Sequence, residues 1–359
     1  MPADNSLRMQ GRIRRKWNIL KTRVWPHHGF YNMHETKLLI KFLDNLRPDI
    51  IHLHNIHNSY INVKMLFSYI KQHHISVVWT LHDCWSYTGH CAYYSAASCN
   101  KWKTACYSCP QLLSYPRSWL LDNSKRNYNM KKELFTMPKN ISLVTVSSWL
   151  KKEVKKSFLN EKPCYTIMNG VDLEVFKPMN FKLLQTDKFI LLGVASTWSK
   201  RKGLKDFIEL SKYLTEDELI VLVGLNTSQI KDLPSNIIGL ERTESQNELA
   251  ALYSQSGVVL SLSEEETFGM TIIEGYACGT PAIVYNSTAT PELIMVNTGM
   301  IVEPGDFSGI RDAIDIIKTS SIDYKNICRN YAVMHFNKDV CYEGYIKLYK
   351  KLLAKRHGF

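Results

Sequence analysis

The sequence predicts a doubly wound α/β protein with two domains, each built on a parallel sheet covered by helices. From about residue 35 onward, short apolar runs rich in β-branched residues alternate with longer stretches whose apolar positions have helical spacing. Polar residues do not alternate within the apolar runs, which is typical of strands buried on both faces of a parallel sheet. The chain has 359 residues, more than one hydrophobic core usually holds, so two domains are expected.

Nine segments have the character of such strands: 49–53, 76–81, 143–146, 165–168, 189–194, 219–224, 237–240, 258–262 and 282–285. The stretch 169–188 separates the first four from the others, because Asn169-Gly170 is followed by Pro178 and a polar run. We expect one domain over 1–170, a second over 171–335, and a C-terminal helix at 336–359 that returns to the first domain. Segment 84–117 is rich in Cys, Tyr, Ser and Lys without periodicity, so it is expected to be an excursion from the end of strand 76–81.

The charge balance favours an anionic partner. Lys and Arg number 45 against 33 Asp and Glu, a formal net charge of +12, which suits nucleic acid, an anionic membrane or a phosphorylated substrate. Because the basic residues are dispersed rather than aligned with interleaved aromatic residues, no nucleic-acid partner is expected. No apolar run approaches the roughly 20 residues that span a bilayer, and the first 25 residues lack the apolar stretch of a secretory signal. A cytoplasmic location is expected.

Two glutamates flank the turn that follows strand 258–262. Glu266 falls at the carboxyl end of the strand and Glu274 lies about one turn inside the next helix. Gly269 between them permits close backbone approach, and the N–H groups that open a helix form an anion site. Two carboxylates around such a turn can accept hydrogen bonds from sugar and ribose hydroxyls. The other interpretation is a solvated acidic loop at 264–266 beside an ordinary helix.

The residues around these glutamates resemble a known motif. With Thr267-Phe268-Gly269 inside it and GYACGTP at 275–281 after it, the segment resembles the donor-sugar motif of glycosyltransferase family 4. Further stretches are similar to the same family: NGVD at 169–172 with Phe176 and Pro178, RKGL at 201–204, and 248–254. The runs HLHNIH, WTLHDCW and GHCAYY resemble, more narrowly, the colanic-acid-type polysaccharide glycosyltransferases of bacteria. The resemblance covers about residues 28 to 350.

This resemblance implies a GT-B fold, in which two Rossmann-like domains face a cleft, the N-terminal one on the acceptor side and the C-terminal one holding the nucleotide sugar. It implies a retaining hexosyltransferase that moves a sugar from a UDP- or GDP-linked donor to a lipid-linked oligosaccharide in bacterial capsule, exopolysaccharide or O-antigen synthesis. Catalysis in the family usually needs no metal, and the enzyme would be peripheral at the inner face of the plasma membrane. The alternative is a catalytically weak member that holds nucleotide sugar or a partner transferase without efficient turnover.

The resemblance also implies roles for individual residues. Glu274 would bind the ribose, Glu266 the hydroxyls of the donor sugar, and Lys202 the diphosphate, whose charge grows as it leaves. His82, at the end of strand 76–81, matches a position near the reacting carbon, although a histidine that only caps a strand is the other interpretation. His82, Glu266 and Lys202 are thus the catalytic candidates, and the donor-binding set is completed by Ser196, Arg201, Arg242, Phe268, Gly269, Met270, Thr271 and Glu274.

Two departures from the family pattern affect the expected activity. The family usually has an arginine five or six residues before the lysine, where this sequence has Ser196 and Thr197, and Arg201 would compensate. Before residue 40 only Gly11 and Gly29 occur, with no apolar strand ahead of either, so the first βαβ unit and its Gly-rich loop are expected to be lacking. We expect such a chain to bind nucleotide sugar and to transfer it poorly.

Four cysteines in the excursion form a C-x7-C-x6-C-x2-C arrangement: Cys91, Cys99, Cys106 and Cys109. The spacing is compatible with a structural zinc ion, with Cys84 able to replace one ligand. Free or partly paired thiols and an iron–sulfur cluster are the other interpretations.

Two basic segments that contain aromatic residues are candidate membrane contacts. WLKKEVKKSF at 149–158 and GRIRRKWNILKTRVW at 11–25 combine lysine or arginine with tryptophan, a composition that suits an anionic membrane surface. A solvated surface helix is the other interpretation of each.

Overall fold

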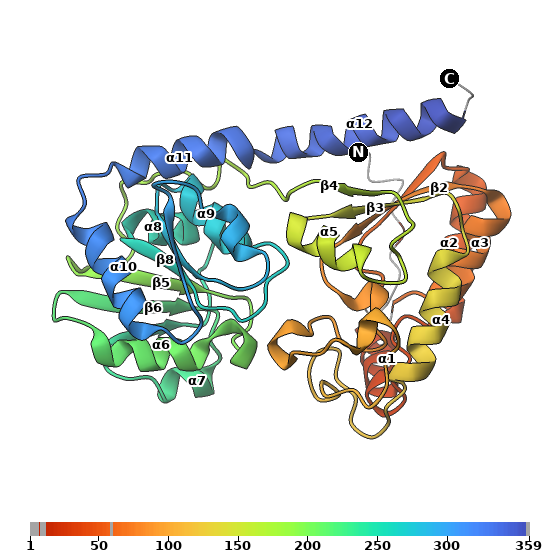
Figure 1. The fold of residues 1–359 in the computed structure, drawn as a ribbon, viewed down its shortest axis with the longest axis horizontal. Helices are drawn as coiled ribbons and strands as arrows, with labels where there is room; N and C mark the ends of the chain where they lie inside the picture. The colour runs from red at the N-terminus through yellow and green to blue at the C-terminus, as the bar shows by residue number, and fades with distance from the viewer. Residues whose placement is uncertain (1–6, 8–11, 58–59, 357–359) are drawn as a thin grey trace. The chain divides into compact units, whose positions relative to one another are not determined.

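The computed structural model describes residue 7 and residues 12–57 and 60–356. It divides into two compact units, of which unit 1 comprises Met1–Ile167 with Lys347–Phe359, and unit 2 comprises Met168–Ile346. Figure 1 shows the elements of each unit along the chain.

Unit 1 alternates helices and strands from α2 onward. Its helices and strands are α1 (Arg12–Val24), α2 (Met33–Leu46), β1 (Ile50–Leu53), α3 (Val63–His73), β2 (Ser76–Leu81), α4 (Ser124–Thr136), β3 (Ile141–Thr145), α5 (Ser148–Lys155) and β4 (Cys164–Thr166). Local capping sets where helices begin: the Asn62 side chain accepts from the Met65 N–H at the start of α3, and Ser147 accepts from the Leu150 N–H at the start of α5. Between β2 and α4 the chain forms only short 3-10 turns, at Trp85–Tyr87, Ser95–Ala97 and Lys101–Lys103.

The sheet of unit 1 is parallel, with its four strands in the order β1-β2-β3-β4. This order runs in one direction only, so the unit is not doubly wound as the sequence suggested. A second half of the sheet would need strands beyond β1, and the described residues ahead of β1 form the two helices α1 and α2. The β2 strand is buried from Val77 onward, which explains its unbroken apolar sequence.

Unit 2 contains the longer run of βα repeats. Its elements are β5 (Phe189–Val194), α6 (Leu204–Leu210), β6 (Glu218–Val223), α7 (Thr227–Lys231), β7 (Ile237–Leu240), α8 (Gln246–Gln255), β8 (Val258–Ser261), α9 (Met270–Ala277), β9 (Ala282–Tyr285), β10 (Gly299–Val302), α10 (Phe307–Thr319) and α11 (Tyr324–His335). Figure 1 shows α8, α9 and α11 on one face of the sheet and α6, α7 and α10 on the other.

The sheet of unit 2 is fully parallel and doubly wound, with the order β10-β9-β8-β5-β6-β7. On one face, buried side chains of α6 and α10, such as Phe207 and Ile314, pack against strand residues such as Leu191 and Leu260. All nine predicted strands are present within a few residues of their predicted bounds. The edge strand β10 was missed, because its four residues are mostly half-buried or exposed and lack the apolar run of a central strand.

The last helix, α12 (Lys338–Arg356), contributes residues to both units. In unit 2, Lys338 Nζ donates to Asp172 Oδ2 over 2.6 Å. In unit 1, the Tyr349 hydroxyl lies 2.5 Å from His52 Nδ1, and the Lys351 ammonium lies 5.2 Å from the centre of the Tyr165 ring. Across the described part of the chain, no helix is both long enough and apolar enough to cross a bilayer.

Candidate functional site: the switch point of the second sheet

The strand order of unit 2 reverses between β5 and β8. From β5 the chain continues to β6 and β7 on one side, whereas from β8 it continues to β9 and β10 on the other. In an open parallel sheet the loops at the carboxyl ends of two such strands diverge, and the crevice between them is where ligands bind. The loops that follow β5 and β8 carry Lys202 and Glu266, respectively.

Gly203 brings these two loops into backbone contact. Its φ is +77°, and a Cβ at this position would lie 2.1 Å from the Leu262 carbonyl oxygen, so both the conformation and the space require glycine. Two residues after Leu262, the Glu264 N–H donates to the Arg201 carbonyl over 2.9 Å. The Arg201 guanidinium in turn donates to the Glu265 carbonyl over 2.5 Å. The RKGL sequence therefore fixes one loop against the other.

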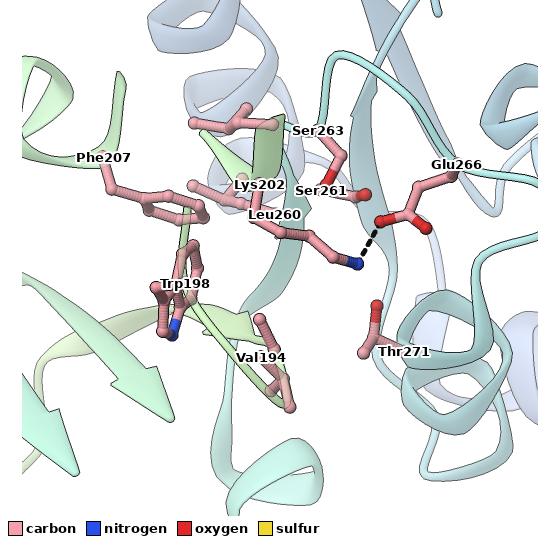
Figure 2. Close-up of a pocket in the computed structure, with 11 residues that line it drawn as sticks. Val194, Trp198, Lys202, Phe207, Leu260, Ser261, Ser263, Glu266 and Thr271 are labelled. Carbon is pink, nitrogen blue, oxygen red and sulfur yellow. Dashed lines mark hydrogen bonds and ion pairs between the residues drawn. The ribbon is translucent and has the colours of Figure 1, made fainter. Parts of the chain in front are cut away.

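Lys202 and Glu266 form an ion pair at the mouth of this crevice (Figure 2). Lys202 Nζ donates to Glu266 Oε1, and Arg201 Nη1 lies 4.0 Å from Glu266 Oε2. Both partners are mostly buried, with side-chain exposures of 21% and 16%. They line a small pocket together with Val194, Ala195, Trp198, Phe207, Leu260, Ser261, Leu262, Ser263 and Thr271. The structure thus brings two of the catalytic candidates, Lys202 and Glu266, together with the donor-binding candidate Thr271.

Thr288 holds the backbone of Glu266. Its hydroxyl accepts from the Glu266 N–H over 2.8 Å and donates to the Glu266 carbonyl over 2.8 Å. The Ala289 N–H donates to the same carbonyl over 3.2 Å. Thr288 has a φ of +52°, which is unusual for a β-branched residue and is often found at functional sites. The loop after β9 therefore fixes the backbone of Glu266 through Thr288 and Ala289.

The α9 helix begins beside this pair. Gly269, the residue before the helix, has a φ of +123°, and a Cβ there would approach Ile272 and Leu293 to about 3 Å. Thr271 in the first turn lines the pocket, while Met270 is 37% exposed. The start of an α-helix offers N–H groups with no partner inside the helix and a partial positive charge. The N-terminal end of α9 is therefore suited to bind an anion.

Glu274 lies one turn further along α9 and accepts a hydrogen bond from Tyr253 of α8. The Tyr253 hydroxyl donates to Glu274 Oε2 over 2.9 Å. Burial raises the pKa of Glu274 from 4.5 to about 7, although the hydrogen bond from Tyr253 acts in the opposite direction. A carboxyl with such a pKa changes its charge near neutral pH.

The remaining donor-binding candidates do not line the pocket. Ser196 is exposed in the turn after β5, and Arg242 is exposed in the loop after β7. Phe268 is buried, and its ring packs edge-on against Phe336. Arg201 contacts the β8 loop through the bonds described above, so its role visible in the structure is to fix that loop.

His82 belongs to unit 1, where it lies in a group of three histidines at the ends of β1 and β2. His82 Nε2 is 2.9 Å from His54 Nδ1, and the two rings stack with centroids 5.2 Å apart. His52 Nε2 is 2.8 Å from the Thr80 hydroxyl. Burial and the neighbouring His54 lower the pKa of His82 to about 4, against the opposing effect of Asp83. His82 is therefore neutral at pH 7.

Cys91, Cys99, Cys106 and Cys109 of the excursion are all free thiols. A hydrogen bond between the Cys91 and Cys109 thiols, together with burial, raises the pKa of Cys91. Cys106 accepts from the Gly89 N–H over 3.2 Å, and Cys99 is half-buried. Among the residues described, no three His, Cys, Asp or Glu side chains are grouped so as to hold a metal ion. Zinc binding remains a prediction from the sequence.

Some residues of the site had no sequence signal for the part they play. Tyr253 lies in the stretch 248–254 that resembles the family, but its contact with Glu274 depends on how α8 packs beside α9. Thr288 and Trp198 lie in loops, and only the fold places them at the crevice. His54 was visible in HLHNIH, since its strand precedes the strand of His82, but the contact between the two requires the β1·β2 register.

The chain is similar to several curated bacterial proteins. The curated "Putative colanic acid biosynthesis glycosyl transferase WcaC" of Escherichia coli (strain K12) is 32% identical over 162 residues, 44% of this chain and 39% of that protein. An "Uncharacterized 41.2 kDa protein in cps region" of Klebsiella pneumoniae is 24% identical over 337 residues, 87% of this chain and 82% of that protein. The "UDP-Gal:alpha-D-GlcNAc-diphosphoundecaprenol alpha-1,3-galactosyltransferase" of Escherichia coli is 27% identical over 208 residues, 51% of this chain and 53% of that protein.

Solved structures share the fold. Anabaena Alr3699/HepE, solved in complex with UDP-glucose, superposes with a TM-score of 0.64 at 15% identity, covering 88% of this chain and 82% of that one. Such a likeness identifies the GT-B fold of two Rossmann-like domains. Residues 10–175 match the family model described as Glycosyltransferase Family 4, and residues 176–333 match the one described as Glycosyl transferases group 1. The chain therefore joins a Glycosyltransferase Family 4 domain to a Glycosyl transferases group 1 domain.

Proposed function

We propose that this protein is a retaining glycosyltransferase that moves a hexose from a UDP- or GDP-linked donor to a lipid-linked oligosaccharide during synthesis of a bacterial surface polysaccharide. The single observation that carries the proposal is the Lys202–Glu266 pair at the switch point of the second sheet, beside the start of α9. A cation, a helix N-terminus and a carboxylate then meet where a parallel α/β sheet binds its ligand.

Each of these groups has a part to play on a nucleotide sugar. The diphosphate gains negative charge as the bond to the sugar breaks, and a nearby lysine and helix N–H groups stabilise that charge more in the transition state than in the ground state. Lys202 and Thr271 in the first turn of α9 line the same pocket, which supports this role. No residue in this scheme needs a metal ion as a partner.

In the free protein, Lys202 and Glu266 neutralise each other. A bound diphosphate would compete with Glu266 for Lys202. Once Lys202 has moved to the diphosphate, the Glu266 carboxylate would be able to accept hydrogen bonds from the sugar hydroxyls. Because Thr288 fixes the Glu266 backbone from the other side, this exchange needs only a rotation of the two side chains. Binding of the donor would thus prepare the group that orients its sugar.

Glu274 supplies the contact to the nucleoside. Its carboxylate lies about one helical turn beyond the pocket-lining Thr271, a spacing that suits the distance from a diphosphate to a ribose. The ribose hydroxyls would donate to the ionised carboxylate while Tyr253 continues to hold Oε2.

The substrate class is proposed from the relatives. Their names associate them with colanic acid, a cps region and a diphosphoundecaprenol acceptor, and the HepE structure holds UDP-glucose. A lipid-linked acceptor would place the enzyme at the cytoplasmic face of the plasma membrane. His82 of unit 1, neutral at pH 7, would hydrogen-bond the sugar or the phosphate near the reacting carbon.

A thermal-shift screen with UDP, GDP and their sugars tests the donor class. The matching nucleotide should raise the melting temperature, and calorimetry should then show that Lys202→Ala binds it about 10- to 100-fold more weakly, since a charge-assisted hydrogen bond contributes about 1.5 to 3 kcal/mol. Lys200→Ala is the matched control, because Lys200 is exposed two residues away and does not line the pocket. If no nucleotide stabilises the protein, or both variants bind equally well, the proposed donor site is wrong.

A further inference from the structure

Unit 1 exposes a group of large apolar side chains on two segments that are distant in the sequence. From α1 and the residue that follows it come Trp17, Leu20 and Trp25, which are 60%, 44% and 58% exposed. From the end of the excursion comes Leu113, and from the residues just after it come Trp119 and Leu120; these three are 68%, 45% and 74% exposed. We call these six residues, together with Lys21, Arg23 and Arg117, the aromatic-basic surface. Large exposed apolar groups of this kind mark sites of interaction.

Direct contacts join the two segments into one surface. The Trp119 N–H donates to the Arg23 carbonyl over 2.8 Å, and the Arg23 guanidinium lies 5.1 Å from the centre of the Trp119 ring. The Ser118 hydroxyl donates to the Leu121 carbonyl over 2.7 Å, which closes a turn with Leu120 at its exposed tip. The Trp119 loop and the end of α1 are therefore held together by the fold.

The surface is also anchored to the body of unit 1. The Tyr31 hydroxyl donates to the Trp25 carbonyl over 2.8 Å, and the Asn127 amide of α4 donates to the Pro26 carbonyl over 2.7 Å. The exposed tryptophans thus project from a supported backbone, and their binding to a partner would cost little ordering of the chain.

Both segments lack acidic residues. The sequence contains no Asp or Glu from Asn5 to His34, nor from Cys84 to Leu121. Among the side chains that the structure describes, the same two stretches hold Lys21, Arg23, Lys101, Lys103 and Arg117. A partner of this surface must therefore be both anionic and able to accept tryptophan and leucine side chains.

We propose that the aromatic-basic surface is the membrane-docking face of the protein and that it binds the surface of an anionic phospholipid bilayer. Tryptophan rings are favoured at the level of the lipid headgroups, lysine and arginine bind lipid phosphates, and a protruding leucine enters the acyl boundary. The inference rests on the part of the proposed function that places the acceptor in a lipid membrane, and it adds the surface that meets that membrane.

The α5 helix, the other basic segment, is less suited to this role. Lys155 donates to the carbonyls of Asn160 and Lys162, and Lys156 donates to Glu153. The Phe158 ring packs edge-on against Tyr128. Lys155, Lys156 and Phe158 of this segment thus already contact the protein itself, in contrast to the exposed Trp17, Trp25 and Leu120 of the aromatic-basic surface.

Nucleic acid is less suited than a bilayer as the anionic partner. Base stacking would use the tryptophan rings, but the most exposed side chains of the surface are Leu120 and Leu113, which have no favourable partner on a phosphate backbone. Burial of one leucine in lipid is favourable by about 1.5 to 3 kcal/mol, or about 10- to 100-fold in affinity. The exposed leucines therefore favour a bilayer over nucleic acid as the partner.

Co-sedimentation of the full chain with phospholipid vesicles tests the proposal. The wild type should bind vesicles that contain phosphatidylglycerol, bind pure phosphatidylcholine vesicles at least about tenfold more weakly, and lose affinity as salt rises. Trp119→Ser with Leu120→Ser should weaken binding to anionic vesicles at least about tenfold, and Lys21→Glu should weaken it severalfold. Phe181→Ser with Val296→Ser is the matched control in unit 2, since these side chains are 62% and 84% exposed, and it should bind as the wild type does.

Several results would overturn the inference. One is an absence of binding to anionic vesicles, and another is an equal loss of vesicle binding in the control variant. A third is a loss of vesicle binding caused by Lys151→Glu with Lys152→Glu on α5 but not by the Trp119 and Leu120 changes. The fourth is tighter binding to single-stranded polynucleotide than to vesicles. A concentration-dependent dimer that the Trp119 and Leu120 changes abolish would instead assign the surface to a second copy. The donor site and the membrane-docking surface can be tested separately. The Trp119, Leu120 and Lys21 variants should bind nucleotide as the wild type does. If the donor site is wrong, binding to vesicles should still be observed.

Discussion

The hydroxyl of Tyr253 on α8 donates a hydrogen bond of 2.9 Å to Oε2 of Glu274 on α9. The contact holds one oxygen of a carboxyl whose pKa is raised by burial to about 7. It therefore gives the proposed ribose-binding group a fixed orientation and a charge that depends on pH in the neutral range.

Nucleotide binding should become tighter as the pH rises through 7. Ribose hydroxyls donate to the ionised form of Glu274, so below its pKa binding must first remove a proton. With a pKa of about 7, the ionised fraction rises about tenfold between pH 6 and pH 8, and the affinity should rise by a similar factor. Calorimetry at several pH values with the wild type and Glu274→Gln measures this. The variant cannot ionise and should show a clearly smaller dependence, so equal slopes for the two proteins would exclude Glu274 as the responsible group.

Replacement of the two site glutamates should separate binding from transfer. Glu274→Ala should weaken binding of the nucleotide about tenfold or more and should remove any preference over the 2′-deoxynucleotide, since the ribose contact is lost. Glu266→Ala should leave nucleotide affinity within about threefold, because it also frees Lys202, while it lowers transfer. The assignment is wrong if Glu274→Ala binds UDP and GDP as tightly as the wild type.

Thr288 should affect transfer through its hydroxyl alone. Thr288→Val keeps the shape and the β-branch but removes both hydrogen bonds to the Glu266 backbone, so transfer should fall about tenfold with a smaller change in nucleotide affinity. Thr288→Ser keeps the hydroxyl and relieves the branched side chain at a φ of +52°, so its transfer should remain close to that of the wild type. If the two variants had equal activity, the hydroxyl would have no positioning role.

The cysteine segment makes a separate prediction about metal. Protein purified without added zinc should contain about one Zn²⁺ per chain, held by Cys91, Cys99, Cys106 and Cys109, and its removal should loosen the excursion without direct effect on the chemistry. Metal analysis combined with thiol titration decides this. Sub-stoichiometric metal together with four titratable thiols would favour the interpretation as free cysteines.

The sequence predicted the strands well because their apolar runs are long and buried, as in 189–194 and 258–262. It missed β10, whose residue Ile301 is 45% exposed, and it could not predict the one-directional sheet of unit 1, which depends on strand pairing. At the site, Glu266, Glu274 and Lys202 could be predicted because they fall in stretches that resemble the family motif. Their partners could not be predicted, because the Lys202–Glu266 pair joins residues 64 positions apart and the Tyr253–Glu274 bond depends on helix packing.

The most direct test of the account is the transfer of radiolabelled sugar from a UDP- or GDP-linked donor to lipid-linked acceptor in bacterial membranes. The wild-type chain should incorporate label into the lipid fraction at a low rate, and the product should keep the anomeric configuration of the donor. Lys202→Ala and Glu266→Ala should each reduce incorporation at least about tenfold, while Lys200→Ala should not. Donor binding without incorporation would identify a protein that holds nucleotide sugar without turnover, and incorporation that is unaffected by Lys202→Ala and Glu266→Ala would contradict the proposed site.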